Sequence, residues 1–564
     1  MKINVTYILI CLLVANFSCQ DLDVVPKTGI SSENFFRNEE ELQIGLNALY
    51  EKNLWKVDED FWTDDMHHRG GEGVNNDISR ATLNSESGLS GAYWTDLYDG
   101  IKRANTLLNE MLKIKETVEP SAYNRIEGEA RAIRAYCYSI LLTKFGDVPL
   151  ITGNPTVDES LDFMRTPQNE VRQFVYDELD AAVGLLEPSN ENRATEGFAL
   201  GIKARVALYT GDYATARDAA QAVIESGTYS LDPDFRKLFL KEGAGSPELI
   251  YFVPQSIELN VTLSNLITRD LIPRNAGGFG ARMVTWEAVD IFEAIDGLPI
   301  DESPLYDPHD PFANRDPRMA QTIVPLGTPW LGYVYQSHPD SVQTLAVNTG
   351  EIINNNDSRG QSIFAAFTGF LWKKGIEQRW ADDPRTADPN IIILRYADVL
   401  LMYAESLIEL GENLEGARDA INQVRARAYG TMVGDITNYP AVTETDQAGL
   451  RVRLRRERRV ELMLEGLRYQ DLIRWRIAKK ALDRLLVGLP EPAQQIRSQW
   501  PFNNEILPTI DDDGVVLLNA PALIANNYAR LLQDYDFDES RMYLWPIPAA
   551  DRLLNNELEQ NPGY

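Results

Sequence analysis

The chain has 564 residues, of which 44% are hydrophobic and 24% charged, an ordinary globular composition that excludes a collagen-like or largely disordered protein. Lysine and arginine number 54 against 84 aspartate and glutamate, a net charge of −30 that argues against nucleic-acid binding as the main activity. With four histidines the chain is also poorly supplied for a histidine-rich metalloenzyme. The length predicts two or three folding units or one large intertwined body.

The N-terminus has the pattern of a lipoprotein signal peptide. Lys2 is followed by an apolar run of roughly 15 residues, too short for an ordinary membrane-spanning helix. The run ends at Ser18-Cys19, so we expect residues 1–18 to be removed and Cys19 to carry lipid. The mature chain would hold 53 basic and 84 acidic residues, a net charge of −31. A buried N-terminal helix with an incidental cysteine is the alternative.

Helical periodicity covers most of the rest of the chain. The predicted helical segments are 40–56, 91–116, 121–145, 168–187, 194–226, 391–428 and 447–485. Residues 204–219 and 404–420 resemble each other, because each has a helix, a glycine turn and a second helix that opens with Ala-Arg-Asp-Ala. These are tetratricopeptide-type helix pairs, scattered rather than in tandem. Cys137 lies inside a predicted helix and reads as a buried core residue.

Two stretches are predicted to be loop-rich, with a few short strands. Residues 228–390 and 486–564 are rich in glycine, proline, asparagine and aspartate. The fold class that follows is mainly α, a scaffold of helix pairs that carries long loop insertions. Long ordered loops on a rigid frame are where binding surfaces are usually built.

Several separated motifs resemble the SusD/RagB family of outer-membrane nutrient-binding lipoproteins. In chain order they are Gly128–Leu150, Ala204–Leu231, Asp296–Pro299, Asn314–Arg318, Leu394–Glu405, Arg456–Trp475, Leu544–Pro548 and Gln560–Tyr564. The resemblance implies four tetratricopeptide-like units, a surface-exposed lipid anchor as the sole membrane contact, and a SusC-like TonB-dependent β-barrel transporter as partner. It also implies a ligand that is most often a glycan and sometimes a peptide, with no covalent chemistry and no cofactor.

The resemblance divides the mature chain into two interleaved regions. Residues 19–230 would form the N-terminal helical region, and 231–564 the second region. The second would comprise a loop-rich insertion at 231–390, helices at 391–485 and a loop-rich segment at 486–564. We expect the two regions to form one intertwined body.

Candidate ligand-binding residues come from aromatic and acidic side chains in loops, because sugars present apolar faces and polar edges. The candidates are Trp62, Asp64, Asp65, Trp286, Trp330, Tyr333, Tyr335 and Trp372. Single aromatics of this kind are more often core or hinge residues than ligand contacts. For Trp330 the two interpretations are even, because Pro329 and Gly332 place it on a turn. A metal at Asp64, Asp65, His67 and His68, or calcium at 511–514, is a weaker alternative, and we expect no metal.

Two other classes of function stay open. A glycan hydrolase needs only two well-placed carboxylates, which a sequence with 84 acidic residues cannot exclude. A tetratricopeptide-type interaction scaffold is the second alternative. The basic island at 449–480, with Glu457, Glu461 and Glu465 at i+4 spacing, is interpreted as intramolecular ion pairing rather than a nucleic-acid patch.

Overall fold

The computed structural model describes residues 35–69, 77–189, 192–490 and 506–564, so Cys19 and the predicted signal peptide lie outside it. Its frame is a stack of antiparallel helices. These are α2 (Glu39–Asn47), α3 (Gly88–Met111), α4 (Pro120–Phe145), α6 (Gln168–Val183), α7 (Glu196–Tyr209), α8 (Tyr213–Glu225), α14 (Tyr396–Leu410), α15 (Leu414–Ala428), α16 (Gln447–Glu461), α17 (Arg468–Arg474) and α18 (Ala478–Leu482). The prediction of a mainly helical fold is confirmed.

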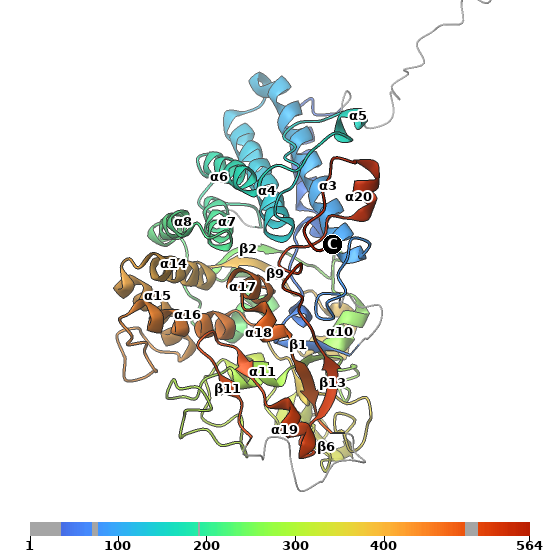
Figure 1. Cartoon of the computed structure of the whole chain (residues 1–564), viewed down its shortest axis with the longest axis vertical. Helices are drawn as coiled ribbons and strands as arrows, with labels where there is room; N and C mark the ends of the chain where they lie inside the picture. The colour runs from blue at the N-terminus through green and yellow to red at the C-terminus, as the bar shows by residue number, and fades with distance from the viewer. Residues whose placement is uncertain (1–34, 70–76, 190–191, 491–505) are drawn as a thin grey trace, which may run out of the picture.

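Each helix packs on the next, from α3 through α4, α6, α7 and α8 to α14, α15 and α16. The contact between α8 and α14 continues the stack across about 170 residues of intervening chain (Figure 1). Small residues make the close packing possible, since Ala216 and Ala220 of α8 and Ala417 and Ala420 of α15 are buried. No helix in the described part of the chain is long and apolar enough to cross a membrane.

The prediction of one helical segment over 447–485 is wrong, because the segment is not continuous. The structure breaks it into α16, α17 and α18, and Gly466 between the first two has a φ of 70°. A side chain at that glycine would meet Val57 and the carbonyl of Asp58, so the chain turns there against the N-terminal region. The predicted helix at 40–56 likewise ends at Asn47 and gives way to two short 3-10 turns.

Short strands lie within the loop-rich stretches, at their edges and, for β1, in the N-terminal region. These are β1 (Met66–His68), β2 (Leu249–Val253), β3 (Arg282–Val284), β4 (Thr328–Trp330), β5 (Tyr333–Tyr335), β6 (Gln343–Ala346), β7 (Glu351–Asn354), β8 (Phe370–Leu371), β9 (Ile391–Arg395), β10 (Leu485–Gly488), β11 (Thr509–Ile510), β12 (Val516–Leu517) and β13 (Arg530–Asp534). The remaining short helices are α5 (Val157–Ser160), α9 (Phe235–Leu238), α10 (Asn265–Leu271), α11 (Trp286–Asp290), α12 (Met319–Thr322), α13 (Arg379–Asp382), α19 (Ala520–Ala525) and α20 (Ala549–Leu554).

Distant parts of the chain meet in these sheets. Strands β2 and β9 pair antiparallel and bring the two ends of the long insertion together beside the helical stack. Strand β1, from the N-terminal region, pairs with β3, and β3 pairs with β8. The C-terminal segment returns to the first helices, where the amide of Trp545 donates to the carbonyl of Lys144 at 2.7 Å. Strands β4, β5, β6 and β7 form a separate antiparallel sheet.

Candidate functional site

A surface cleft of about 440 Å³ lies at the tip of the β4–β5 hairpin. Its volume falls within the range of small-molecule sites. The residues that line it are Arg236, Leu240, Pro329, Trp330, Leu331, Gly332, Val347, Asn348, Ile376, Glu377 and Gln378. They come from four stretches of the insertion, so the insertion's own folding builds the cleft.

The turn of this hairpin sets the position of its aromatic residues. Leu331 and Gly332 both have positive φ, 47° and 86°, as a two-residue type I′ turn requires. Trp330 and Tyr333 flank the turn and pair directly across the strands, so their side chains lie on the same face. Both are half-buried. A leucine held in the left-handed region stores roughly 1 kcal/mol or more of strain, which the buried Leu331 side chain offsets.

Two cations lie beside the indole ring of Trp330. The guanidinium carbon of Arg236 is 5.4 Å from the ring centroid and the Lys373 ammonium is 5.7 Å from it. Arg236 is held in place by donating Nη2 to the carbonyl of Ile376 at 2.5 Å and Nη1 to that of Lys373. Burial lowers the pKa of Arg236 to about 10, so it stays charged. The cleft thus combines an aromatic ring with charged and amide donors, the groups that hold sugar faces and hydroxyls.

Trp62, Asp64 and Asp65 do not face a binding surface, which corrects that part of the sequence prediction. Trp62 is 1% exposed and its ring packs edge-on against Tyr469 and Trp545. Arg459 binds both aspartates and Arg468 binds Asp64, at 2.7–3.0 Å. These partners lie about 400 residues further along the chain, which is why the local sequence resembled an exposed loop.

Trp286, Trp372 and Tyr335 are also buried, so the structure places these three candidates away from solvent. Trp286 donates its indole N–H to the carbonyl of Thr368 at 2.8 Å, and the Tyr335 hydroxyl donates to that of Gly369 at 3.0 Å. Trp372 is fully buried where it follows β8. Trp286 is the first residue of α11, which begins just after β3, and it is buried as well. Of the aromatic candidates, Trp330 and Tyr333 keep partial exposure.

The possible metal ligands are engaged in other contacts. His68 Nε2 lies 3.2 Å from Asp270, and His67 Nδ1 lies 3.4 Å from the Tyr535 hydroxyl. In the 511–514 loop, Asp511 and Asp513 both bind Lys480. Within the described ranges no group of three or more histidine, cysteine or acidic residues is arranged to hold a metal ion.

The basic island forms a buried ion-pair network, as interpreted from the sequence. Glu461 on α16 is fully buried and accepts from Arg318 at 2.9 Å, from Arg395 at 2.6 Å and from Arg427. Glu457 accepts from Arg318 as well, at 2.6 Å. The three guanidinium groups hold the pKa of Glu461 far below its usual range. The network joins the insertion to the helical stack.

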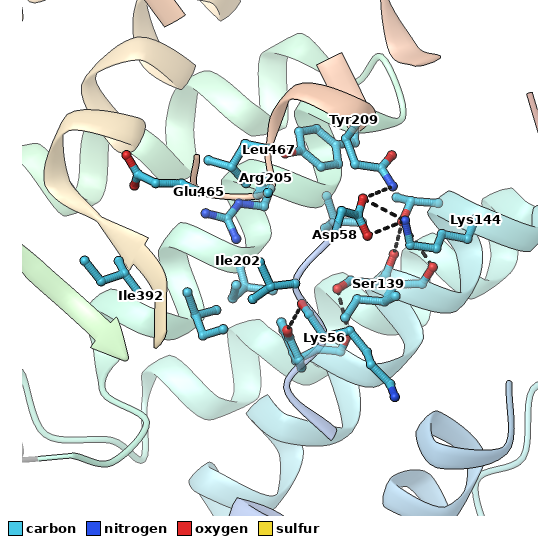
Figure 2. Close-up of a pocket in the computed structure, with 18 residues that line it drawn as sticks. Lys56, Asp58, Ser139, Lys144, Ile202, Arg205, Tyr209, Ile392, Glu465 and Leu467 are labelled. Atoms are coloured by element: carbon cyan, nitrogen blue, oxygen red, sulfur yellow. Dashed lines mark hydrogen bonds and ion pairs between the residues drawn. The ribbon is translucent and has the colours of Figure 1, made fainter. Parts of the chain in front are cut away.

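A smaller cavity, of about 80 Å³, lies between α4, α7 and β9. Figure 2 shows the residues that line it. Lys144 and Asp58 pair at its edge at 2.8 Å, and Lys144 is also 4.7 Å from the centroid of the Trp545 ring. The volume is well below that of ordinary ligand sites, so this cavity is a feature of the core.

A second surface cleft, of about 580 Å³, lies where the 229–254 stretch approaches the start of α7. Tyr229, Lys241 and Phe252 are among its lining residues. The Tyr229 hydroxyl is already engaged, since it lies 3.2 Å from the Thr195 hydroxyl and 3.4 Å from the carbonyl of Pro188. We therefore favour the cleft at Trp330. Sequence reasoning identified Trp330 and Tyr333 but missed Arg236 and Lys373, which lie far from the hairpin in sequence.

Comparison with known proteins agrees with this architecture. The SusD family matches residues 251–564, and the family described as "Starch-binding associating with outer membrane" matches 22–208. The SusD-like protein P38 of Formosa agariphila is 27% identical over 89% of this chain and 96% of its own length. A SusD-like carbohydrate-binding protein of Bacteroides fragilis has a similar structure, with a TM-score of 0.76 and 25% identity over 93% of this chain and all of its own. Surface glycan-binding protein A of Bacteroides fluxus shares the fold at 20% identity, with a TM-score of 0.62 over 93% of this chain and all of its own. The chain therefore belongs to the SusD family.

Proposed function

We propose that this protein is a glycan-binding lipoprotein of the outer-membrane surface, which captures an oligosaccharide or polysaccharide and passes it to a TonB-dependent β-barrel transporter. The observation that carries the proposal is the cleft at the β4–β5 hairpin, where Trp330 lies beside Arg236 and Lys373. Tyr333 pairs with Trp330 across the strands and shares its face of the hairpin. Family membership supports it, as do the names of the relatives, which refer to carbohydrate binding and outer-membrane association.

Binding without catalysis fits the chemistry of the cleft. Glu377 is the only carboxylate among the described residues that line it, and Arg379 already binds that side chain. A glycosidase places two carboxylates on either side of the bond that it cleaves. The alternative of a general interaction scaffold has less support, because it gives no role to a cleft of this chemistry.

Gel electrophoresis through immobilised polysaccharides, followed by calorimetry on the retained ones, tests the binding role. Trp330→Ala should weaken binding by roughly five- to thirty-fold, equivalent to about 1–2 kcal/mol, and Trp330→Phe should lose less because a ring remains. Tyr229→Ala in the other cleft is the matched control and should leave the affinity unchanged. Unchanged binding by Trp330→Ala together with weaker binding by Tyr229→Ala would move the site to the larger cleft. Steady release of reducing ends would favour the hydrolase instead.

The anchor and the partner need a separate experiment. Cys19→Ala should abolish incorporation of labelled palmitate and release the protein from the outer-membrane fraction, because a cysteine thiol is the site of lipid attachment in the predicted signal. The wild-type protein, but not Cys19→Ala, should then co-purify from membranes with a β-barrel transporter. Retention of Cys19→Ala in the membrane together with palmitate labelling would show that the anchor lies elsewhere.

A further inference from the structure

Four arginines and two phenylalanines from β13, from the end of β1 and from the loops after α10 and β7 lie together. The members of this arginine–phenylalanine cluster are Arg69, Arg274, Arg359, Arg530, Phe364 and Phe367. They come from four segments that are distant in sequence. The cluster is separate from the cleft at Trp330, which none of its members lines.

Guanidinium groups and rings alternate through the cluster. Arg274 and Arg69 lie 5.7 and 6.0 Å from the centroid of the Phe364 ring. Arg69 is also 5.4 Å from the Phe367 ring, which Arg359 and Arg530 approach to 5.2 and 4.7 Å. Phe364 is 55% exposed, so one end of the arrangement is open to solvent.

Arg69 and Arg274 have no carboxylate partner in the described part of the chain. Arg69 donates to two carbonyl oxygens, those of Phe364 and, at 2.8 Å, of Phe279. The guanidinium of Arg274 makes no hydrogen bond to a described residue, and its Nε is buried without an acceptor. Arg359 and Arg530 have further contacts, so Arg69 and Arg274 are the arginines of the cluster that would bind a ligand anion.

The nearby carboxylates are engaged elsewhere. Asp270 lies 3.2 Å from His68 Nε2. Asp357 accepts the backbone N–H groups of Arg274 and Asn275 at 2.7 and 3.0 Å. Their charges attract the arginines, but neither forms an ion pair with a guanidinium of the cluster.

The like charges repel one another. Burial and the charges of Arg274 and Arg359 lower the pKa of Arg69, and burial with the charge of Arg359 lowers that of Arg530 to about 10. Arg459, by contrast, is neutralised by two aspartates. A bound anion would relieve the repulsion.

We propose that the arginine–phenylalanine cluster binds the carboxylate or sulfate groups of an acidic glycan. Guanidinium forks match the oxygens of both groups, and the exposed Phe364 ring offers a flat surface for the sugar's C–H face. The inference rests on the proposed function in taking the ligand to be a glycan, and it adds acidic sugars as the ligand class. A phosphate of an anionic lipid surface would use the same guanidinium chemistry, so the experiment must separate the two.

Matched probes that differ only in charge give the test. Calorimetry would compare dextran with dextran sulfate, and methyl-esterified with free polygalacturonate, on protein that begins at Gln20. We expect the charged member of at least one pair to bind ten-fold or more tightly than its neutral partner. Arg274→Gln should lower only the affinity for the charged member, by about ten-fold, and Arg274→Lys should lose less. Arg385→Gln removes a well exposed arginine outside the cluster and should change nothing.

Three results would overturn the inference. Equal affinity for the charged and neutral members of both pairs is the first, and full affinity of Arg274→Gln for the charged probe is the second. The third is Arg274-dependent binding to phosphatidylglycerol vesicles without binding to either polyanion, which would identify a lipid surface. Trp330→Ala separates the two claims, because it should weaken neutral and charged glycans alike. If no glycan binds, the proposed function fails as well; if neutral glycans bind without a gain from charge, the inference alone fails.

Discussion

Removing the central carboxylate of the ion-pair network tests how the fold is held together. Glu461→Gln replaces the acceptor of Arg318, Arg395 and Arg427 with a neutral amide. A hydrogen bond to a charged group is worth about 1.5–3 kcal/mol, and the Glu461 side chain accepts three of them. The loss on substitution is smaller than their sum, because glutamine keeps one acceptor oxygen and Arg318 keeps its bond to Glu457. We therefore expect a loss of about 3–5 kcal/mol, the usual result of breaking a buried pair.

The loss converts into a measurable shift in melting temperature. An unfolding entropy of about 2.1 cal/mol/K per residue gives roughly 1.2 kcal/mol/K for 564 residues, so calorimetry should show a fall of roughly 3–4 °C. Because the pKa of Glu461 is lowered in the folded chain, its contribution is complete above its ordinary value of 4.5 and is lost as the pH falls below it. The shift should be equal at pH 7 and pH 5.5 and smaller below pH 4.

The same measurement tests whether the predicted regions 19–230 and 231–564 form one intertwined body. The network itself lies within 231–564. The two regions are joined by the pairing of β1 with β3 and by the ion pairs of Arg459 with Asp64 and Asp65, so a single transition should move as a whole. Glu415→Gln is the control, because its contact with Arg418 is exposed and 3.5 Å long, and we expect a change below about 0.5 °C. A shift under about 1 °C for Glu461→Gln would show that the network does not stabilise the fold. Two transitions, of which only one is displaced, would show that the chain does not unfold as a single body.

Three further predictions concern buried groups. Burial raises the pKa of Asp290 to about 7. Between about pH 4 and 7 the carboxyl is therefore protonated in the folded chain and ionised in the unfolded chain. Stability consequently falls as the pH rises through this window. The free energy of unfolding of Asp290→Asn, measured by thermal unfolding, should therefore equal that of the wild type near pH 4 and exceed it by up to about 4 kcal/mol at pH 8. A difference that does not change with pH would contradict this. Burial raises the pKa of Cys137 to about 12, so thiol reagents at pH 8 should label it only after denaturant is added. Gly466→Ala should cost roughly 2 kcal/mol or more by urea unfolding, because the new carbon would lie 2.5 Å from Val57 Cγ1 at a φ of 70°.

The sequence was sufficient to predict those elements whose structure is determined by neighbouring residues. The helix–turn–helix units follow from the glycine turn at Gly211, the cap at Asp212, whose side chain accepts the amide of Thr215 at 3.2 Å, and the small residues beyond. The aromatic at the hairpin tip was recognisable because Pro329 and Gly332 mark a turn.

The sequence failed where distant segments decide burial. Nothing near Trp62 shows that Tyr469 and Trp545 will cover it, since they lie more than 400 residues away. The cations beside Trp330 were missed for the same reason, because Arg236 in α9 and Lys373 after β8 are both distant from the hairpin in sequence. Periodicity reports local conformation, whereas a site assembled from several loops depends on tertiary contacts.

The net charge of the protein repels an acidic ligand, whereas the arginine–phenylalanine cluster attracts it, and the ionic strength distinguishes the two effects. At low ionic strength the net charge of −30 repels a polyanion at long range, whereas at physiological salt the Debye length is about 8 Å and the ligand near Arg69 and Arg274 responds mainly to the cluster. Raising salt from about 10 to 150 mM should therefore speed association with dextran sulfate by relieving repulsion. It should also speed dissociation, because it screens the guanidinium contacts. Surface plasmon resonance should show both rate constants rising for the wild type, and a weaker salt effect on dissociation for Arg274→Gln. A fall in the association rate would mean that a positive field larger than the cluster dominates the encounter, and the assignment to these arginines would be wrong.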